Sequence, residues 1–143
     1  MKASKSITLA VKRVLKDVSR GFTEQDTKGL LELFGDDKDT MLIGSGVDEK
    51  RIGKSQIRVQ LERDWAQADV ISAEFKVGGV SAKSDVAWTF GGLIIKAKAK
   101  GKLIKMSGRF TMVFEKKQAK WVIMQSHFSI PVAGQLKGSS WAG

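Results

Sequence analysis

The chain has 143 residues, a formal net charge of +10, one histidine and no cysteine. This length fits one domain, and the 42% hydrophobic content is enough for a buried core. The lack of cysteine excludes disulfides, thiolate metal sites and cysteine nucleophiles, and a single histidine excludes histidine-rich metal sites. No apolar run is long enough to cross a bilayer, and the charged N-terminus is unlike a signal peptide. We therefore expect a cytoplasmic protein without a membrane partner.

The positive charge is concentrated in two segments. Residues 1–20 hold six basic residues and one acid, and residues 96–120 hold nine basic residues and one acid. In the second segment, four lysines alternate with Ala or Gly from Lys96 to Lys102, a pattern typical of a strand. At the solvated tip of a hairpin, such lysines either bind an anionic partner or keep the sheet edge soluble. No aromatic residue interleaves with them, so nucleic-acid binding is the weakest interpretation.

Two helices are predicted at the N-terminus. Apolar residues recur at helical spacing between Ser4, which can cap the first helix, and Gly21, which can end it. A second helix is expected to start at Thr23, with acids in its first turn, and to stop at Gly35.

A short strand at residues 40–44, a brief return pairing near Arg51 and a third helix between Gly53 and Ala66 come next. The rest of the chain reads as long strands, joined by short turns such as Lys100-Gly101 and Gln118-Ala119. The expected strands are residues 70–81, 85–99, 102–117 and 121–130.

This order of elements predicts an α+β fold, with three N-terminal helices packed on a strongly curved antiparallel sheet. The pairs Gly78-Gly79 and Gly91-Gly92 lie inside strands, where glycine often marks a bulge or bend. A bent sheet covered by helices makes a cone with an internal pocket. We expect one domain at residues 1–131 and a flexible Gly- and Ser-rich tail at residues 132–143.

The two turns set the expected pairing of the long strands and so divide their residues between two faces. A bulge at Gly91-Gly92 or at Gly108 would exchange part of this assignment, and the pattern does not say which face lines the cavity. One face is expected to carry Trp88, Phe90, Ile94, Arg109, Thr111, Met124, Ser126 and Phe128. The other is expected to carry Ala87, Thr89, Leu93, Phe110, Met112, Gln125, His127 and Ser129.

Three polar residues could carry chemistry. Arg109 either anchors an anionic or carbonyl-bearing ligand or forms a structural ion pair, for example with Asp64. Asp64 is either a general base whose pKa is raised inside the cone or a solvated acid at a helix end. His127 either transfers protons near neutral pH or holds a backbone carbonyl or a partner subunit. Trp65 and Trp88 offer flat walls to a ring-bearing ligand, or simply pack in the core.

The order of helices and strands, the segment RIGKSQI at the third helix and the closing segment GRFTMVFEKKQAKWVIMQSHFS carry a family likeness. Over residues 4–131 the chain resembles the SnoaL-like branch of the nuclear-transport-factor-2-like superfamily, which has a cystatin-like, ketosteroid isomerase-like cone. Trp121, His127 and Ser129 match the Trp and His-x-Ser pattern of its last strand. The chain is also similar to the association domain of calcium/calmodulin-dependent protein kinases. The resemblance implies a pocket and a homodimer, but no particular reaction.

Two main functions follow as expectations. The first is a pocket for a small, largely apolar organic ligand, with or without acid–base catalysis of the isomerase, dehydratase or cyclase type. Such a reaction would need no metal and no cofactor, with Asp64 or His127 moving the proton and Arg109 stabilising an oxyanion. The second is a non-catalytic homodimer or hub that associates through a sheet face. In the first case the ligand contacts are expected to be Trp65, Trp88, Phe90, Thr111 and Ser129.

Overall fold

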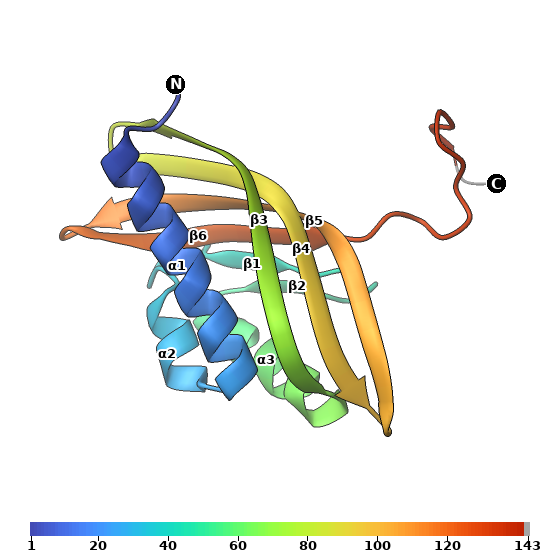
Figure 1. Cartoon of the computed structure of the whole chain (residues 1–143). Coiled ribbons are helices and arrows are strands. Elements are labelled where there is room, and N and C mark those ends of the chain that lie inside the picture. Colours follow the sequence, from blue (N-terminus) through green and yellow to red (C-terminus); the bar gives the residue numbers. More distant parts are fainter. Residues whose placement is uncertain (142–143) are drawn as a thin grey trace.

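Six strands form one sheet in the order β2-β1-β6-β5-β4-β3, with β1 parallel to β6 and the other pairs antiparallel. The structure is a computed structural model that describes residues 1–141 (Figure 1). It confirms the α+β prediction, since the N-terminal helices cover one side of a curled sheet. The elements are α1 (Lys5–Glu24), α2 (Thr27–Glu32), β1 (Met41–Ile43), β2 (Lys50–Ile52), α3 (Lys54–Gln67), β3 (Asp69–Lys83), β4 (Val86–Ala99), β5 (Lys102–Lys117) and β6 (Lys120–Ser129).

Helix α1 begins as predicted but ends later. The Ser4 hydroxyl oxygen accepts a hydrogen bond from the Ile7 backbone N–H at 3.2 Å, as an N-cap does. The prediction that Gly21 ends this helix is wrong, because α1 continues to Glu24. Gly21 is buried against α2, where a Cβ would lie 2.8 Å from Cγ of Leu30. The glycine therefore serves the close approach of two helices rather than a helix end.

Helix α2 begins at Thr27, four residues after the predicted Thr23 cap. Asp26 is the actual N-cap, and its Oδ1 accepts a hydrogen bond from the Gly29 backbone N–H at 2.9 Å. The Thr23 hydroxyl instead donates to the carbonyl oxygen of Ser19 within α1 at 2.9 Å. Both residues are of the capping type, so the sequence pattern alone does not choose between them.

The predicted turns are confirmed. Lys100 and Gly101 have φ of 49° and 76°, and Gln118 and Ala119 have φ of 49° and 68°, so both residues of each turn are left-handed, as tight hairpins require. Strand β4 pairs with β5 without interruption along the whole length of β4. The pattern allowed a bulge or a bend at Gly91-Gly92, and β4 has no bulge there.

Three register shifts bend the sheet. Of the two in β3, one falls between Val70 and Ser72, and the other falls between Val77 and Gly79, at the predicted Gly78-Gly79 pair. The one in β6 was not expected, and leaves Met124 unpaired between Ile123 and Gln125. Because side chains alternate between faces, this extra residue reverses the orientation of everything after it in β6.

The bulge at Met124 corrects the predicted division of the sheet. His127 lies opposite Thr111 and Ser129 lies opposite Arg109, so these residues share one face instead of two. Phe128 moves to the opposite face, with Phe110 as its partner.

The face against the helices, here called the inner face, carries the core. It presents a run of almost fully buried side chains that pack with Val11, Leu15, Leu30 and Ile57 of the helices. The outer face carries Arg109, Thr111, Gln125 and His127, all exposed. Which face meets the helices, left open by the strand pattern, is thereby settled. The buried apolar residues of this face in the core cluster are Val80, Ala87, Leu93, Phe110, Met112, Phe114 and Ile123.

The chain leaves the sheet after β6. Residues 130–141 contain only turns and bends, are exposed, and run away from the sheet (Figure 1). The mobility expected of residues 132–143 stays a prediction, and residues 142 and 143 lie outside the described part of the chain. None of the helices within residues 1–141 has the length and apolar character needed to span a membrane.

Candidate functional site

Helix α3 places a polar pair on its inner side. Ile57, Gln60 and Leu61 are buried, and Asp64 follows Gln60 one turn later, half-buried. Residues four apart lie one above the other on a helix, so Gln60 and Asp64 face the same way. Gln60 is only 2% exposed, which is unusual for a glutamine unless its amide is fully hydrogen-bonded.

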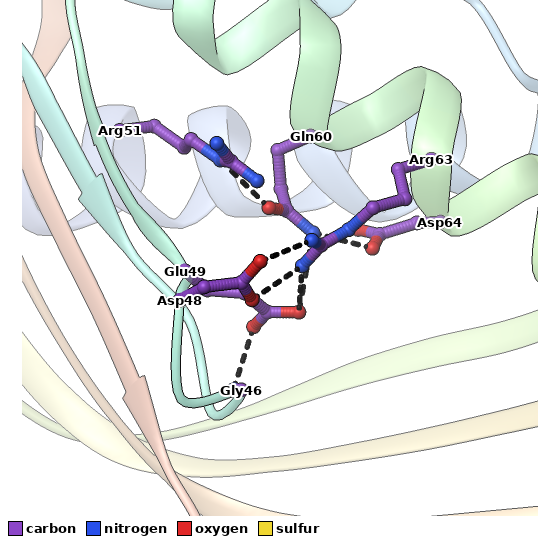
Figure 2. Close-up of polar contacts among 7 residues, drawn as sticks. All are labelled: Gly46, Asp48, Glu49, Arg51, Gln60, Arg63 and Asp64. Carbon is purple, nitrogen blue, oxygen red and sulfur yellow. Dashed lines mark hydrogen bonds and ion pairs between the residues drawn. The ribbon is translucent and has the colours of Figure 1, made fainter.

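The Gln60 amide uses both of its ends (Figure 2). Its Oε1 accepts from Nε of Arg51 in β2 at 2.9 Å, and its Nε2 donates to Oδ1 of Asp64 at 2.7 Å. The same Nε2 donates to Oε1 of Glu49 at 3.2 Å. An arginine on one side and two carboxylates on the other fix which end of the amide is oxygen. Gln60 therefore ties α3 to β2 and to the loop before it.

The β1–β2 loop is held against α3 by charge. Arg63 donates to both carboxylate oxygens of Asp48, at 2.7 and 3.1 Å, and to Oε1 of Glu49 at 3.2 Å. Glu49 also accepts from the Gly46 backbone N–H at 2.8 Å (Figure 2). The hydrogen bonds from Arg63 hold the pKa of Asp48 below its usual value. These contacts hold the β1–β2 loop beside Asp64.

The surroundings of Asp64 shift the pKa of its carboxyl group. Burial raises its pKa above the ordinary value, and the nearby charge of Glu49 raises it further. The hydrogen bond from Gln60 and the charges of Arg63 and Arg51 oppose that shift. Its Oδ2 makes no hydrogen bond to any side chain within residues 1–141. Asp64 thus combines one fixed oxygen with one that can accept from, or donate to, a bound molecule.

Trp65, the neighbour of Asp64, has a structural contact. Its indole Nε1–H donates to the carbonyl oxygen of Phe22 at 3.0 Å. The two rings also pack, with centroids 6.0 Å apart. Trp65 therefore joins the last turns of α1 to α3, and any ligand would meet only the part of its ring that these contacts leave open.

Arg109, His127 and Ser129 come together, but away from Asp64. Nε of Arg109 donates to the Ser129 hydroxyl at 3.3 Å, while His127 lies next to them opposite Thr111. All lie on the outer face, and α3 packs on the inner side of the sheet. The ion pair considered between Arg109 and Asp64 is not formed.

The two aromatic residues predicted in β4 also belong to the outer face. Trp88 is half-buried, whereas Phe90 is 57% exposed. The Phe90 ring covers the bulge in β3, where a Cβ on Gly78 would lie 2.6 Å from a ring carbon. Of the eight predicted site residues, six thus lie on the outer face and two, Asp64 and Trp65, on α3.

Sequence reasoning missed Gln60, Glu49, Arg51 and Arg63. The available signal was the spacing of Gln60, three residues after buried Ile57 and four before Asp64, which places a polar residue on an apolar helix face. No comparable spacing marks Glu49, Arg51 and Arg63, because their contacts join the β1–β2 hairpin to α3, which are separate segments of the sequence.

Residues 11–133 match the family model of the SnoaL-like domain. The chain belongs to the SnoaL-like domain family. As no curated protein sequence matches it significantly, the other comparisons are with solved structures.

Solved structures share the fold of this SnoaL-like domain. One is a nuclear transport factor 2-like superfamily protein from Salmonella enterica serovar Typhimurium, with TM-score 0.80, 16% identity and coverage of 96% of this chain and 99% of that one. A candidate dehydratase of the same family from Streptomyces avermitilis has TM-score 0.78, 15% identity and coverage of 91% and 100%. A candidate calcium/calmodulin-dependent protein kinase II association domain from Xanthomonas campestris has TM-score 0.75, 21% identity and coverage of 86% of both chains. At these identities the likeness concerns the fold alone.

Two surface hollows of the SnoaL-like domain lie away from these residues. One, of about 370 Å³, lies between α2 and α3 and is lined by Lys28, Lys54 and Arg58 among others. The other, of about 400 Å³, lies between α1 and the bulge of β3. Neither includes Asp64 or Arg109 in its lining. The internal pocket stays a prediction.

Proposed function

We propose that this SnoaL-like domain binds a small, largely apolar molecule with one polar group at the inner side of the cone, next to Asp64. The observation that carries the proposal is the state of this carboxyl. It is half-buried with a raised pKa, one oxygen is oriented by Gln60, and the other has no side-chain partner within residues 1–141. Ionisable groups perturbed by burial and held by a buried partner cluster at functional sites.

An apolar wall on the same side of the sheet supports the proposal. Ile104 lies opposite buried Ala97 and so belongs to the inner face, yet it is exposed. Met106 and Ile95, the next inner-face pair, are half-buried. The helices therefore leave the β4–β5 end of the inner face uncovered, and apolar surface open to solvent favours an apolar ligand.

If the domain is catalytic, Asp64 is the group that exchanges the proton. A carboxyl with a raised pKa gives or takes a proton closer to neutral pH, as isomerisation and dehydration require. The fold is shared with the candidate dehydratase from Streptomyces avermitilis. His127 and Arg109 have no part in this proposal, because they lie on the other face of the sheet.

A ligand survey by thermal shift tests the proposal, using wild-type protein, Asp64→Asn and, as matched control, Asp39→Asn. Asp39 is an exposed aspartate whose side chain makes no hydrogen bond or ion pair among those of residues 1–141. We expect ligands that stabilise the wild type to lose at least about fivefold in affinity with Asp64→Asn, as for one charge-assisted hydrogen bond. They should bind Asp39→Asn unchanged. Equal binding to all three proteins would disprove the site.

A second proposal concerns self-association. Within residues 1–141, no helix covers the outer face, which presents exposed Phe90 and several half-buried apolar side chains. Single exposed apolar residues are common, but a contiguous apolar face indicates a protein interface. We propose that two copies associate through it, with Arg109, Thr111 and His127 at the interface. The half-buried apolar residues of this face are Met41, Ile43, Trp88, Ile94, Val113 and Val122.

Sedimentation of the wild type, Phe90→Lys and Leu9→Lys tests this second proposal. Leu9 is an equally exposed apolar residue, but it lies on α1. We expect dimers of the wild type and Leu9→Lys at micromolar concentration and monomers of Phe90→Lys, because a buried, unpaired lysine opposes association. A monomeric wild type would contradict the proposal.

A further inference from the structure

The β4–β5 hairpin ends in a strongly basic tip, defined here as residues 96–105. It contains five lysines and no acid. In Figure 1 this hairpin ends at the far end of the sheet from the N-terminus, beside the start of β3. The tip is therefore an extremity of the molecule that can approach a flat surface.

The five lysines of the tip are not paired with acids within the described part of the chain. None of the lysines takes part in an ion pair within residues 1–141, although Asp69 of β3 lies opposite Lys98. Lys96 and Lys105 are directly opposite each other across β4 and β5. Like charges in such a pair destabilise a sheet. This arrangement disfavours the hairpin itself and favours a partner that supplies negative charge.

Apolar side chains stand exposed among the lysines. Leu103 is 69% exposed and lies opposite Lys98. Ile71 is 51% exposed at a register shift in β3, between the residues that pair with Lys96 and Ala97. If the lysines served only to keep the protein soluble, these two exposed aliphatic side chains would not be expected among them.

We propose that the tip binds the surface of an anionic phospholipid membrane. The lysine ammonium groups meet the phosphates and carboxylates of the headgroups, and Leu103 and Ile71 enter the apolar boundary below them. Basic residues combined with exposed aliphatic side chains are the two contributions that hold peripheral proteins at such surfaces. The sequence gives no sign of this membrane partner, because it has no apolar run long enough to cross a bilayer and the exposure of Leu103 and Ile71 is visible only in the fold.

A nucleic acid fits the tip less well. Residues 93–107 contain no aromatic, arginine or amide side chain. Bases would therefore find no aromatic stacking platform and no guanidinium or amide that reads their edges. A phosphate backbone also gives Leu103 no favourable contact.

Vesicle co-sedimentation of the full chain tests the proposal. The vesicles are phosphatidylcholine with or without phosphatidylserine, in about 0.05 M and about 0.5 M NaCl, which span weak and strong screening. The tip variant is Lys98→Gln, Lys100→Gln, Lys102→Gln and Lys105→Gln combined. Its matched control removes four exposed charges of α1 through Lys5→Gln, Lys12→Gln, Arg13→Gln and Lys16→Gln. Leu103→Ser is compared with Leu9→Ser, and circular dichroism checks that each variant folds. Lys100→Gln with Lys102→Gln, at the exposed turn, replaces any unfolded tip variant.

We expect the wild type to bind only vesicles with phosphatidylserine, and to be released at high salt. The tip variant should lose at least about tenfold in partitioning, and the α1 variant less than about twofold. Leu103→Ser should weaken binding severalfold, and Leu9→Ser should not. Equal losses in both four-site variants, or no effect of Leu103→Ser, would overturn the proposal. It would also be overturned if a short duplex nucleic acid displaced the protein while Leu103→Ser still bound normally.

Discussion

Gln60 connects three parts of the SnoaL-like domain through one buried amide. It joins Arg51, Glu49 and Asp64, and no other side chain in its position could serve a cationic donor and two carboxylates together. Replacing it by an apolar side chain of similar size would leave the side chains of Arg51 and Asp64 without a hydrogen bond within residues 1–141, while Glu49 would keep those from Arg63 and Gly46. The contribution of Gln60 to the stability of the fold can be measured without a ligand.

Gln60→Leu is therefore expected to lower the free energy of unfolding by about 1–3 kcal/mol, the usual effect of leaving buried polar groups unsatisfied. Urea denaturation measures this. Gln67→Leu, at the exposed end of the same helix, is the control and should change stability by less than about 0.5 kcal/mol. Similar small effects of both substitutions would show that the Gln60 hydrogen bonds contribute nothing net.

The contributions of Asp64 and Asp48 to the stability of the fold should change with pH in opposite directions. The pKa of Asp64 is raised in the folded state, so its ionised form disfavours folding, and this penalty fades as pH falls through the folded pKa. The pKa of Asp48 is lowered in the folded state, so its ionised form stabilises the fold. This stabilisation is present at pH values above the pKa of Asp48 in the unfolded chain, and it is lost as pH falls through the pKa in the folded state. The change in the free energy of unfolding caused by Asp64→Asn should therefore be more favourable at about pH 7 than at about pH 4.

Denaturation of both variants across this pH range checks the prediction. Asp48→Asn should be less stable than wild type at neutral pH, and the difference should shrink as the pH falls below the ordinary pKa of an aspartate. Asp64 and Asp48 are thus each other's controls. The same sign of pH dependence in both variants would contradict the electrostatic account of this site.

Glycine has different roles at two neighbouring positions of β4. A Cβ on Gly91 would collide with the backbone carbonyl oxygen of Lys76, whereas a Cβ on Gly92 would find its nearest neighbour at 3.8 Å. Gly91→Ala is therefore expected to lower stability by about 2 kcal/mol or more, because a strand must move. Gly92→Ala should be within about 0.5 kcal/mol of wild type. Thermal unfolding of the two proteins measures the difference, and equal melting temperatures would contradict the close approach of β3 and β4.

The sequence predicted the strands well because their turns are locally coded. Lys100-Gly101 and Gln118-Ala119 lie between alternating runs, and β5 has the predicted bounds. It predicted the bulges only in part. Gly78-Gly79 marks one, but Met124 is an ordinary strand residue, and nothing in its side chain indicates that it is unpaired. This bulge alone placed His127 and Ser129 on the outer face. Arg109 and Thr111 lie there through regular pairing, and the strand pattern had left open which face meets Asp64 and the helices.

At the scale of the whole molecule, the net charge of +10 hides two different surfaces. Much of it is concentrated at one hairpin end, while the outer face is apolar around a polar stripe along β5 and β6. A protein that dimerises through this face should melt at a temperature that depends on concentration, because dissociation accompanies unfolding.

We expect the melting temperature of the wild type to rise by several degrees when its concentration is increased about 100-fold. The melting temperature of Phe90→Lys should not change. Calorimetry at the two concentrations measures both proteins, with Leu9→Lys as a control that should behave like wild type. A concentration-independent wild type would mean that the dimer contributes nothing to stability.

The bulge at Met124 has a consequence for the evolution of such domains. Deleting one residue there would restore regular pairing and turn His127 and Ser129 from the outside of the molecule to its inside, with no other change in sequence. A single codon gained or lost in the last strand therefore exchanges, beyond that point, the side chains of the outer face with those of the inner face. Two homologues with the same Trp and His-x-Ser residues can then use them on opposite sides of the sheet. Gaps in alignments of this strand carry functional information that residue identity does not.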